Sequence, residues 1–181
     1  MADIQMGKYA SMLLRHRPEE AGVVLDEHGW TDVADLVAKV KPKYPDISEE
    51  LLHKMAFAPD KQRYEFSEDN KRIRAVHGHS VSVDLGYEAK EPPAILYHGS
   101  AEKFREGIEK EGLIKKSRQF VHLSENLKAA EEVGHRHGKL VLYEIAAKQM
   151  YDAGFVFYRS TSGVWLTDNV PLEFMKEITS V

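Results

Sequence analysis

Apolar residues are spaced in two different ways along this chain, and the change of spacing limits the folds that it can adopt. In the N-terminal part they recur every three or four residues, which is typical of one buried face of a helix. This pattern predicts three helices, over Gln5–Arg17, over 31–40 with Thr31 as the cap, and over 47–58 with Ser48 at the start.

The spacing then changes to two, as on a half-buried strand. Residues 63–67 and 72–76 alternate in this way and predict a β-hairpin. Three helices followed by a hairpin is the element order of a winged-helix unit, so we assign residues 1–88 to a winged-helix lobe. The next segment, LGYEAKEPPA (85–94), combines glycine, two prolines and opposing charges, and we expect it to separate two lobes.

Residues 94–181 form the second predicted lobe, in which strands outnumber helices. Its predicted helices are 101–111 and 125–133. Its predicted strands are 95–98, 120–123, 140–145, 156–158, 164–167 and 174–178. The chain as a whole is therefore expected to be an α+β protein.

Charge and cysteine content exclude several classes of function. The formal charge is −4 at pH 7, which argues against a protein that coats long nucleic acids through many phosphate contacts. The chain has no cysteine, so neither a disulfide framework nor a thiolate metal site is available. The first residues lack the basic stretch and apolar run of a signal peptide, so we expect a cytoplasmic protein with no membrane partner. Nothing in the sequence demands an oligomer, and we expect a monomer.

The first lobe contains clusters of basic residues that have both a chemical and an ordinary structural explanation. RHRP, with Arg15 and His16, could bind and protonate a phosphate or complement the dipole of the first helix. KQRY, which contains Arg63, could bind phosphate or form the solvated face of the hairpin.

IRAVHGHS extends the hairpin and contains Arg74, His77 and His79. The two histidines alternate like metal ligands on one strand face, but no third ligand is evident, and we expect no metal. Gly78 between them indicates a close backbone approach instead.

The second lobe has three further motifs. In YHGS, Gly99 would let a ligand come close and Ser100 could cap the next helix, although a plain strand–turn–helix connection explains the motif equally well. SRQFVHLS places a cation before a strand whose His122 and Ser124 point the same way. GHRHG, with Arg136 at its centre, is also typical of a helix end followed by a loop.

RHRP, KQRY, IRAVHGHS, LYHGS, SRQFVHLS and GHRHG occur in this order and cover nearly the whole chain. Together they resemble the motifs of the tRNA 2′-phosphotransferase family, whose second lobe is similar to ADP-ribosyltransferases. Six ordered motifs at compatible spacing are far more specific than any one of them. The resemblance implies a winged-helix RNA lobe followed by an ADP-ribosyltransferase-like lobe that binds NAD⁺.

The resemblance also implies which residues form the site. The family's essential Arg-His-Arg-Arg tetrad falls on Arg15, His16, Arg63 and Arg118. The residues matched to NAD⁺ binding are Tyr97, His98, Gly99, Ser100, His122, Ser124 and Arg136, and those matched to RNA contact are Arg74, His77 and His79.

At two positions the sequence departs from the motifs of this family or of its protein-modifying relatives. His77 stands where the family usually has glutamine, so we expect altered RNA contacts and no loss of activity. The acidic residue that ends the triad of many protein-modifying relatives has no counterpart, and Val164 is the candidate for its place.

The implied reaction removes an internal 2′-phosphate from RNA, which in some organisms is the family's task in tRNA splicing, and consumes NAD⁺. The phosphate attacks the anomeric carbon and expels nicotinamide, which gives an ADP-ribosylated RNA intermediate. The adjacent ribose hydroxyl then attacks the same phosphorus, which releases RNA and ADP-ribose 1″,2″-cyclic phosphate. Three arginines suit such a reaction because they neutralise a phosphate that must approach a pyrophosphate.

Two other functions fit parts of the sequence. An ADP-ribosyltransferase would stop after the first step and leave ADP-ribose on a nucleic-acid phosphate, but Arg63 and Arg118 have an evident use in the second step. A non-catalytic winged-helix regulator predicts a basic third helix. The segment 47–58 has one lysine against two glutamates, and this reading leaves the second lobe unexplained.

Overall fold

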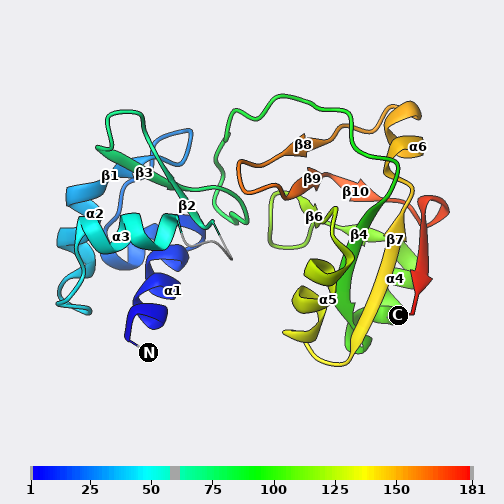
Figure 1. Ribbon diagram of the computed structural model, residues 1–181, viewed down its shortest axis with the longest axis horizontal. Helices are drawn as coiled ribbons and strands as arrows, with labels where there is room; N and C mark the ends of the chain where they lie inside the picture. The colour runs from blue at the N-terminus through cyan, green and yellow to red at the C-terminus, as the bar shows by residue number, and fades with distance from the viewer. Residues whose placement is uncertain (1, 58–61, 180–181) are drawn as a thin grey trace. The chain divides into compact units, whose positions relative to one another are not determined.

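The computed structural model describes residues 2–57 and 62–179, and in it the chain divides into two compact units, Met1–Gly86 and Tyr87–Val181 (Figure 1). The division falls within the segment LGYEAKEPPA. Ala58, at the end of the third predicted helix, and Lys61 of the KQRY motif lie outside the described residues. Each unit is considered by itself below.

The first unit contains the three predicted helices and the predicted hairpin, together with a short strand and a 3₁₀ turn. In chain order its elements are α1 (Ala2–Arg15), η1 (Pro18–Ala21), β1 (Thr31–Asp32), α2 (Val33–Val40), α3 (Glu49–Ala56), β2 (Tyr64–Phe66) and β3 (Arg72–Ala75). The strands form one antiparallel sheet in the order β1-β3-β2.

The starts of α2 and α3 show one wrong and one correct prediction of a helix cap. Ser48 caps α3, because its side chain accepts the N–H of Leu51 at 3.1 Å. Thr31 does not cap α2. It pairs with Ile73 as part of β1, and the next residue, Asp32, accepts the N–H of Asp35 and caps the helix instead.

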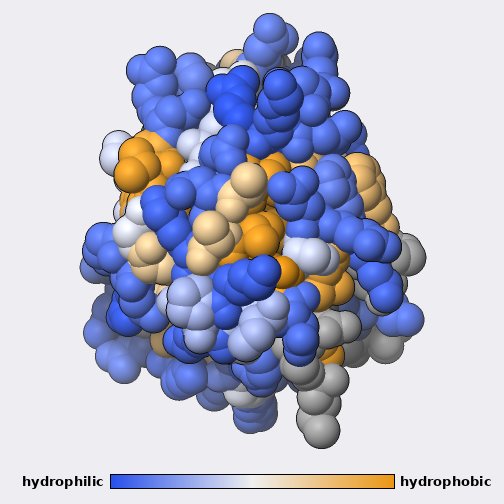
Figure 2. Space-filling view, turned by 90° about the vertical axis from the view of Figure 1, so that its left-hand side faces the viewer, coloured by the Kyte–Doolittle hydropathy of each residue, from blue (hydrophilic) through white to orange (hydrophobic). Residues whose placement is uncertain are grey.

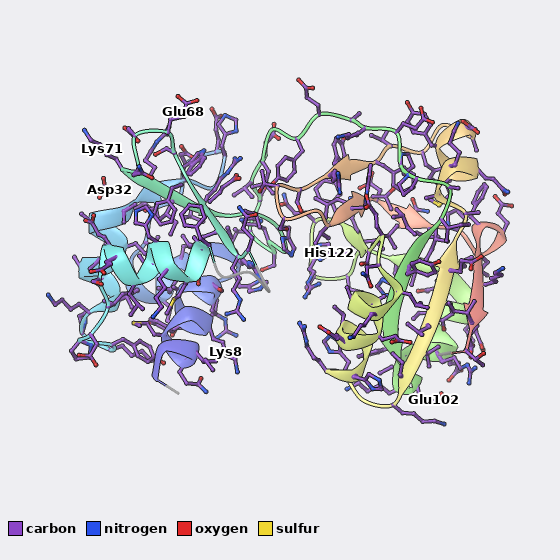
Figure 3. The ribbon with its side chains drawn as sticks, viewed as in Figure 1. Lys8, Asp32, Glu68, Lys71, Glu102 and His122 are labelled. Carbon is purple, nitrogen blue, oxygen red and sulfur yellow. The ribbon has the colours of Figure 1, made fainter. Side chains whose placement is uncertain are left out.

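The helices and the sheet of the first unit share one hydrophobic core. Leu13 of α1, Leu36 of α2, Leu52 of α3 and Ile73 of β3 are all fully buried in it. Full burial of such a side chain contributes about 1.5–3 kcal/mol each. The turn of the hairpin, where Figure 3 labels Glu68 and Lys71, lies outside this core as an exposed loop.

The second unit is rich in short antiparallel strands. In chain order its elements are β4 (Leu96–Ala101), η2 (Glu102–Phe104), α4 (Arg105–Glu111), β5 (Leu113–Ile114), β6 (Val121–Leu123), α5 (Leu127–His135), β7 (Leu140–Ile145), α6 (Ala147–Asp152), β8 (Tyr158–Arg159), β9 (Trp165–Thr167), β10 (Asn169–Val170), η3 (Leu172–Phe174) and β11 (Met175–Ile178). The presence of helices and sheets in the chain confirms the predicted α+β class.

The strands of the second unit form three small sheets, ordered β11-β7-β4, β6-β9-β8 and β10-β5. Strand β4 pairs with β7 along its whole length, from Leu96 opposite Ile145 to Ala101 opposite Leu140. A separate backbone bridge between Tyr97 and Ser124 connects β4 to the end of β6.

Helix α5 packs directly on the backbone of β4, next to which it lies in Figure 1. A Cβ atom at Gly99 would lie 1.7 Å from the carbonyl oxygen of Ala130, and one at Gly134 would lie 2.8 Å from that of Ser100. The missing side chain of Gly99 therefore makes room for α5, whereas the sequence analysis expected it to make room for a ligand. This contact fixes the position of α5.

Strand β4 also runs beyond its predicted end at His98, which corrects the prediction for Ser100. Ser100 is a strand residue that is 6 % exposed, and it pairs with Val141 of β7. The turn that follows has Ala101 at its N-cap and no side-chain cap. Ser100 is therefore not a helix cap.

No helix in the described part of the chain is both long and apolar enough to cross a membrane. Hydrophilic residues cover most of the face shown in Figure 2, with hydrophobic ones in small groups between them. Most large apolar side chains lie instead in the two cores.

Substitution of Gly99 tests the packing of α5 on β4. Gly99→Ala should lower the free energy of unfolding by about 3 kcal/mol, because the added methyl group must displace backbone atoms. Gly107→Ala is the control, since that glycine lies in α4 with open space around it and alanine favours the helix by up to about 1 kcal/mol. Urea unfolding of both variants measures the difference, and equal stabilities would contradict the close contact.

Candidate functional site

The first unit places three of the four tetrad residues on or beside α1. Arg15 is the last residue of α1, and one of its guanidinium nitrogens lies 3.4 Å from the carbonyl oxygen of Arg63. The guanidinium of Arg63 lies beside Gly7 of the same helix. The structure thus brings Arg15, His16 and Arg63 to one helix.

Tyr64 explains why Arg63 lies against α1. Its ring is fully buried, and its hydroxyl donates to the carbonyl of Gly7 at 2.6 Å and lies 2.8 Å from the hydroxyl of Ser11. Burial raises the pKa of Tyr64, so the phenol stays protonated and can donate. This anchor attaches β2 to α1.

Arg74 is held by contacts within the first unit. Its side chain is 12 % exposed, forms an ion pair with Glu65 across the hairpin, and donates to the carbonyls of His28 and Leu85 at 3.2 and 3.1 Å. Its guanidinium also lies 4.5 Å from the ring centre of Trp30. These contacts favour a structural role for Arg74 over the RNA contact that the resemblance implies.

His79 is enclosed by the first unit, whereas His77 is half-buried. His79 is 2 % exposed, and neither of its ring nitrogens has a hydrogen-bond partner among the described residues. Burial lowers its pKa to about 4, and the positive charges of Arg15, His16 and Arg74 act in the same direction. We therefore expect His79 to be a neutral packing residue and not a direct RNA contact.

In the second unit, His98 of β4 has a defined tautomer. Its Nδ1 lies 2.9 Å from the backbone carbonyl of His122, and a carbonyl only accepts, so Nδ1 carries the hydrogen. Nε2 is then the nitrogen that can accept a hydrogen from a ligand. Burial lowers the pKa of His98, which favours this neutral form, although the hydrogen bond acts in the opposite direction.

Arg118 and His122 contact each other close to His98. A guanidinium nitrogen of Arg118 lies 3.2 Å from Nδ1 of His122, which is labelled in Figure 3. Because a guanidinium only donates, Nδ1 of His122 accepts this bond. The fourth tetrad residue thus lies beside two of the residues matched to NAD⁺ binding.

The remaining candidates of the second unit have mainly structural contacts. Tyr97 and Ser124 exchange backbone hydrogen bonds of 2.8 and 2.9 Å, and the hydroxyl of Ser124 bonds to the backbone of Asn126 before α5. Arg136 is the exposed C-cap of α5, as the helix-end interpretation of GHRHG predicts. The backbone of Val164 closes a turn with Ser160.

Sequence reasoning missed one carboxylate in this region. Glu125, directly after the HLS motif, accepts the indole N–H of Trp165 at 2.7 Å and lies 3.3 Å from Arg159. Only the fold brings together these residues, which are 40 and 34 positions apart. The Glu125 carboxylate therefore connects the end of β6 to Trp165 of β9 and Arg159 of β8.

The described residues contain no group of three or more histidine or acidic side chains that could hold a metal ion. The two histidines of IRAVHGHS in particular differ in exposure, since His79 is buried and His77 is half-buried.

Acidification tests the enclosed state of His79. In the unfolded chain its pKa is near 6.5, whereas in the folded protein it is about 4, so the unfolded state takes up the proton first. The stability contributed by neutral His79 is present above pH 6.5 and is lost as the pH falls toward 4, by about 3 kcal/mol. Urea unfolding of the wild type, of His79→Leu and of the exposed-site control His135→Gln measures this.

His79→Leu should remove most of that loss, and His135→Gln should keep it. If the free energy of unfolding depends on pH in the same way in the wild type and in His79→Leu, His79 is not an enclosed, neutral histidine.

Comparison with known proteins supports a single family. The model of the "RNA 2′-phosphotransferase, Tpt1 / KptA family" matches residues 1–169. A probable RNA 2′-phosphotransferase of Fusobacterium nucleatum is 43 % identical over 175 residues, which cover 96 % of this chain and 98 % of that protein. One of Agrobacterium fabrum is 48 % identical over 168 residues, with 93 % and 90 % coverage. These findings confirm the resemblance, and the chain belongs to the RNA 2′-phosphotransferase family.

Proposed function

We propose that this protein removes an internal 2′-phosphate from RNA and transfers it to the ADP-ribose part of NAD⁺, with release of nicotinamide. Family membership supports the phosphotransferase activity. The observation that carries the NAD⁺ part is the position of His98, whose Nδ1 lies 2.9 Å from the backbone carbonyl of His122. Its Nε2 can accept a hydrogen from a ribose hydroxyl, which fits the NAD⁺-binding role that the resemblance gives to His98.

We assign the first unit to the winged-helix class and expect it to contact RNA. The element order α1-β1-α2-α3-β2-β3 and the sheet order β1-β3-β2 support this assignment. The third helix begins with two glutamates, so recognition of a broad stretch of backbone phosphates through this helix is not expected. We expect local recognition of one 2′-phosphate and its neighbours.

The second unit is assigned to the ADP-ribosyltransferase type. Its antiparallel sheets and the YHGS sequence on β4, with α5 packed on that strand, support the assignment. The residue that fits a dinucleotide best is His98, through Nε2. Beside it, Arg118 can pair with the anionic RNA phosphate while His122 holds one of its nitrogens.

We propose that the tetrad acts on the phosphate itself. Arg15, Arg63 and Arg118 neutralise its charge, which reduces its repulsion from the pyrophosphate and stabilises the phosphoryl oxygens when the phosphorus is attacked. His16 donates a proton to the departing RNA oxygen or orients the phosphate. The proposed chemistry uses these side chains and NAD⁺ and requires no metal.

A short RNA with one internal 2′-phosphate, incubated with and without NAD⁺, tests the proposed function. The phosphate should disappear only with NAD⁺, and mass spectrometry should find nicotinamide and ADP-ribose cyclic phosphate. His98→Ala should raise the KM for NAD⁺ by about tenfold, which is the loss of one hydrogen bond of about 1.4 kcal/mol. Phosphate loss without NAD⁺ would refute the proposal, and ADP-ribosylated RNA as the final product would identify an ADP-ribosyltransferase.

Variants of two arginines test whether the tetrad acts on phosphoryl transfer. Arg63→Ala and Arg118→Ala should each remove about 2–4 kcal/mol of transition-state stabilisation and should accumulate ADP-ribosylated RNA. Arg72→Ala is the matched control, because Arg72 is an exposed arginine of the same hairpin as Arg63. Single-turnover assays follow substrate, intermediate and product. The assignment fails if both variants form the final product as fast as the control.

A further inference from the structure

The loop after β3 is attached to the C-terminal end of α1. Helix α1 ends where the N–H groups of His16 and Arg17 both bond to the carbonyl of Met12, at 2.9 and 3.0 Å. The carbonyl of Arg15 then accepts the N–H groups of Ser80 and Val81, at 2.9 and 3.2 Å. A carbonyl that the helix itself leaves without a partner is satisfied by this loop.

These backbone bonds place the Ser80 side chain beside His16. The hydroxyl oxygen of Ser80 lies 2.9 Å from Nδ1 of His16, although the two residues are 64 positions apart. Both residues are exposed, so this bond competes with water. The anchored backbone on either side reduces the entropy lost when the bond forms.

A hydroxyl suits a histidine that changes its protonation state, because it can both donate and accept. With neutral His16, the 2.9 Å contact fits either direction, and when the hydroxyl donates to Nδ1 the ring hydrogen is on Nε2. With protonated His16, the hydroxyl accepts from Nδ1–H, and Nε2 again carries a hydrogen. In the protonated state, and in the neutral state in which the hydroxyl donates, Nε2 carries a hydrogen.

We propose that Ser80 is a positioning residue for His16. In this proposal the Ser80 hydroxyl holds the ring and donates to Nδ1 of the neutral form, so that the hydrogen on Nε2 is the one offered to the RNA phosphate. This inference rests on the proposed function, in which His16 acts on that phosphate. It assigns a role within IRAVHGHS to the last residue of the motif, while Arg74 and His79 of the same motif are enclosed by the first unit.

Three variants test the proposal in the full-length protein. Ser80→Ala removes the hydroxyl, Ser80→Thr keeps it, and Ser82→Ala is the matched control at another exposed serine of the same loop. With saturating NAD⁺ and the 2′-phosphorylated RNA, Ser80→Ala should lower kcat about tenfold and leave KM nearly unchanged. Ser80→Thr should restore most of the rate, and Ser82→Ala should match the wild type.

The tautomer of His16 gives a second measurement that does not depend on activity. In protein with ¹⁵N-labelled histidine, the His16 signals, assigned by comparison with His16→Ala, should show the hydrogen on Nε2 in the neutral form. In Ser80→Ala the two tautomers should mix. A neutral ring with its hydrogen on Nδ1 in the wild type, or spectra unaffected by Ser80→Ala, would overturn the proposal.

The outcomes also separate this inference from the proposed function. If the wild type does not use NAD⁺, or if His16→Ala is as fast as the wild type, the proposed function fails, while the spectra still report whether Ser80 orients the ring. If His16→Ala is slow and Ser80→Ala is as fast as the wild type, the role of Ser80 fails and the proposed function stands.

Discussion

Helix α5 can lie on the backbone of strand β4 only because Gly99 and Gly134 have no side chains at their contact. A packed interface of this kind has one close-fitting arrangement, so it fixes β4 as well as the helix. Strand β4 in turn bonds to the end of β6 through Tyr97 and Ser124. The carbonyl of His122 therefore reaches Nδ1 of His98. The orientation of this imidazole is a consequence of backbone packing.

The first unit positions its candidate residues by the same means. The buried Tyr64 attaches β2 to α1, and the loop that follows β3 bonds to the last carbonyl of α1. Hydrogen bonds thus fix the end of α1, where Arg15 and His16 lie, and the start of β2, which follows Arg63. Long side chains can act reproducibly on a phosphate when their backbones are fixed, because less conformational entropy is lost on binding.

Local sequence predicted the elements whose signals are local. The apolar periods of α1, α2 and α3 and the alternation of β2 and β3 are visible in the sequence, and so is the cap Ser48. The errors have tertiary causes. Thr31 does not cap α2 because it pairs with Ile73 of β3. Ser100 does not cap a helix because it stays in β4, where it pairs with Val141 of β7. The strands β5 and β10 have two residues each, which is too short for any period to show. The ordered motifs indicated the family and a set of candidate site residues, but not which of these residues are enclosed.

The enclosed residues explain why IRAVHGHS is a long motif although few of its side chains are available for chemistry. Arg74 is paired with Glu65, so its charge is compensated within the first unit. His79 is neutral because a charged ring would have to be desolvated beside cations. Restricting the charge in this way suits the proposed function, in which an acidic protein binds one phosphate and then releases the RNA, since each added phosphate contact would slow release. The motif therefore combines a structural part, which builds the loop, with the hydroxyl that the loop presents to His16.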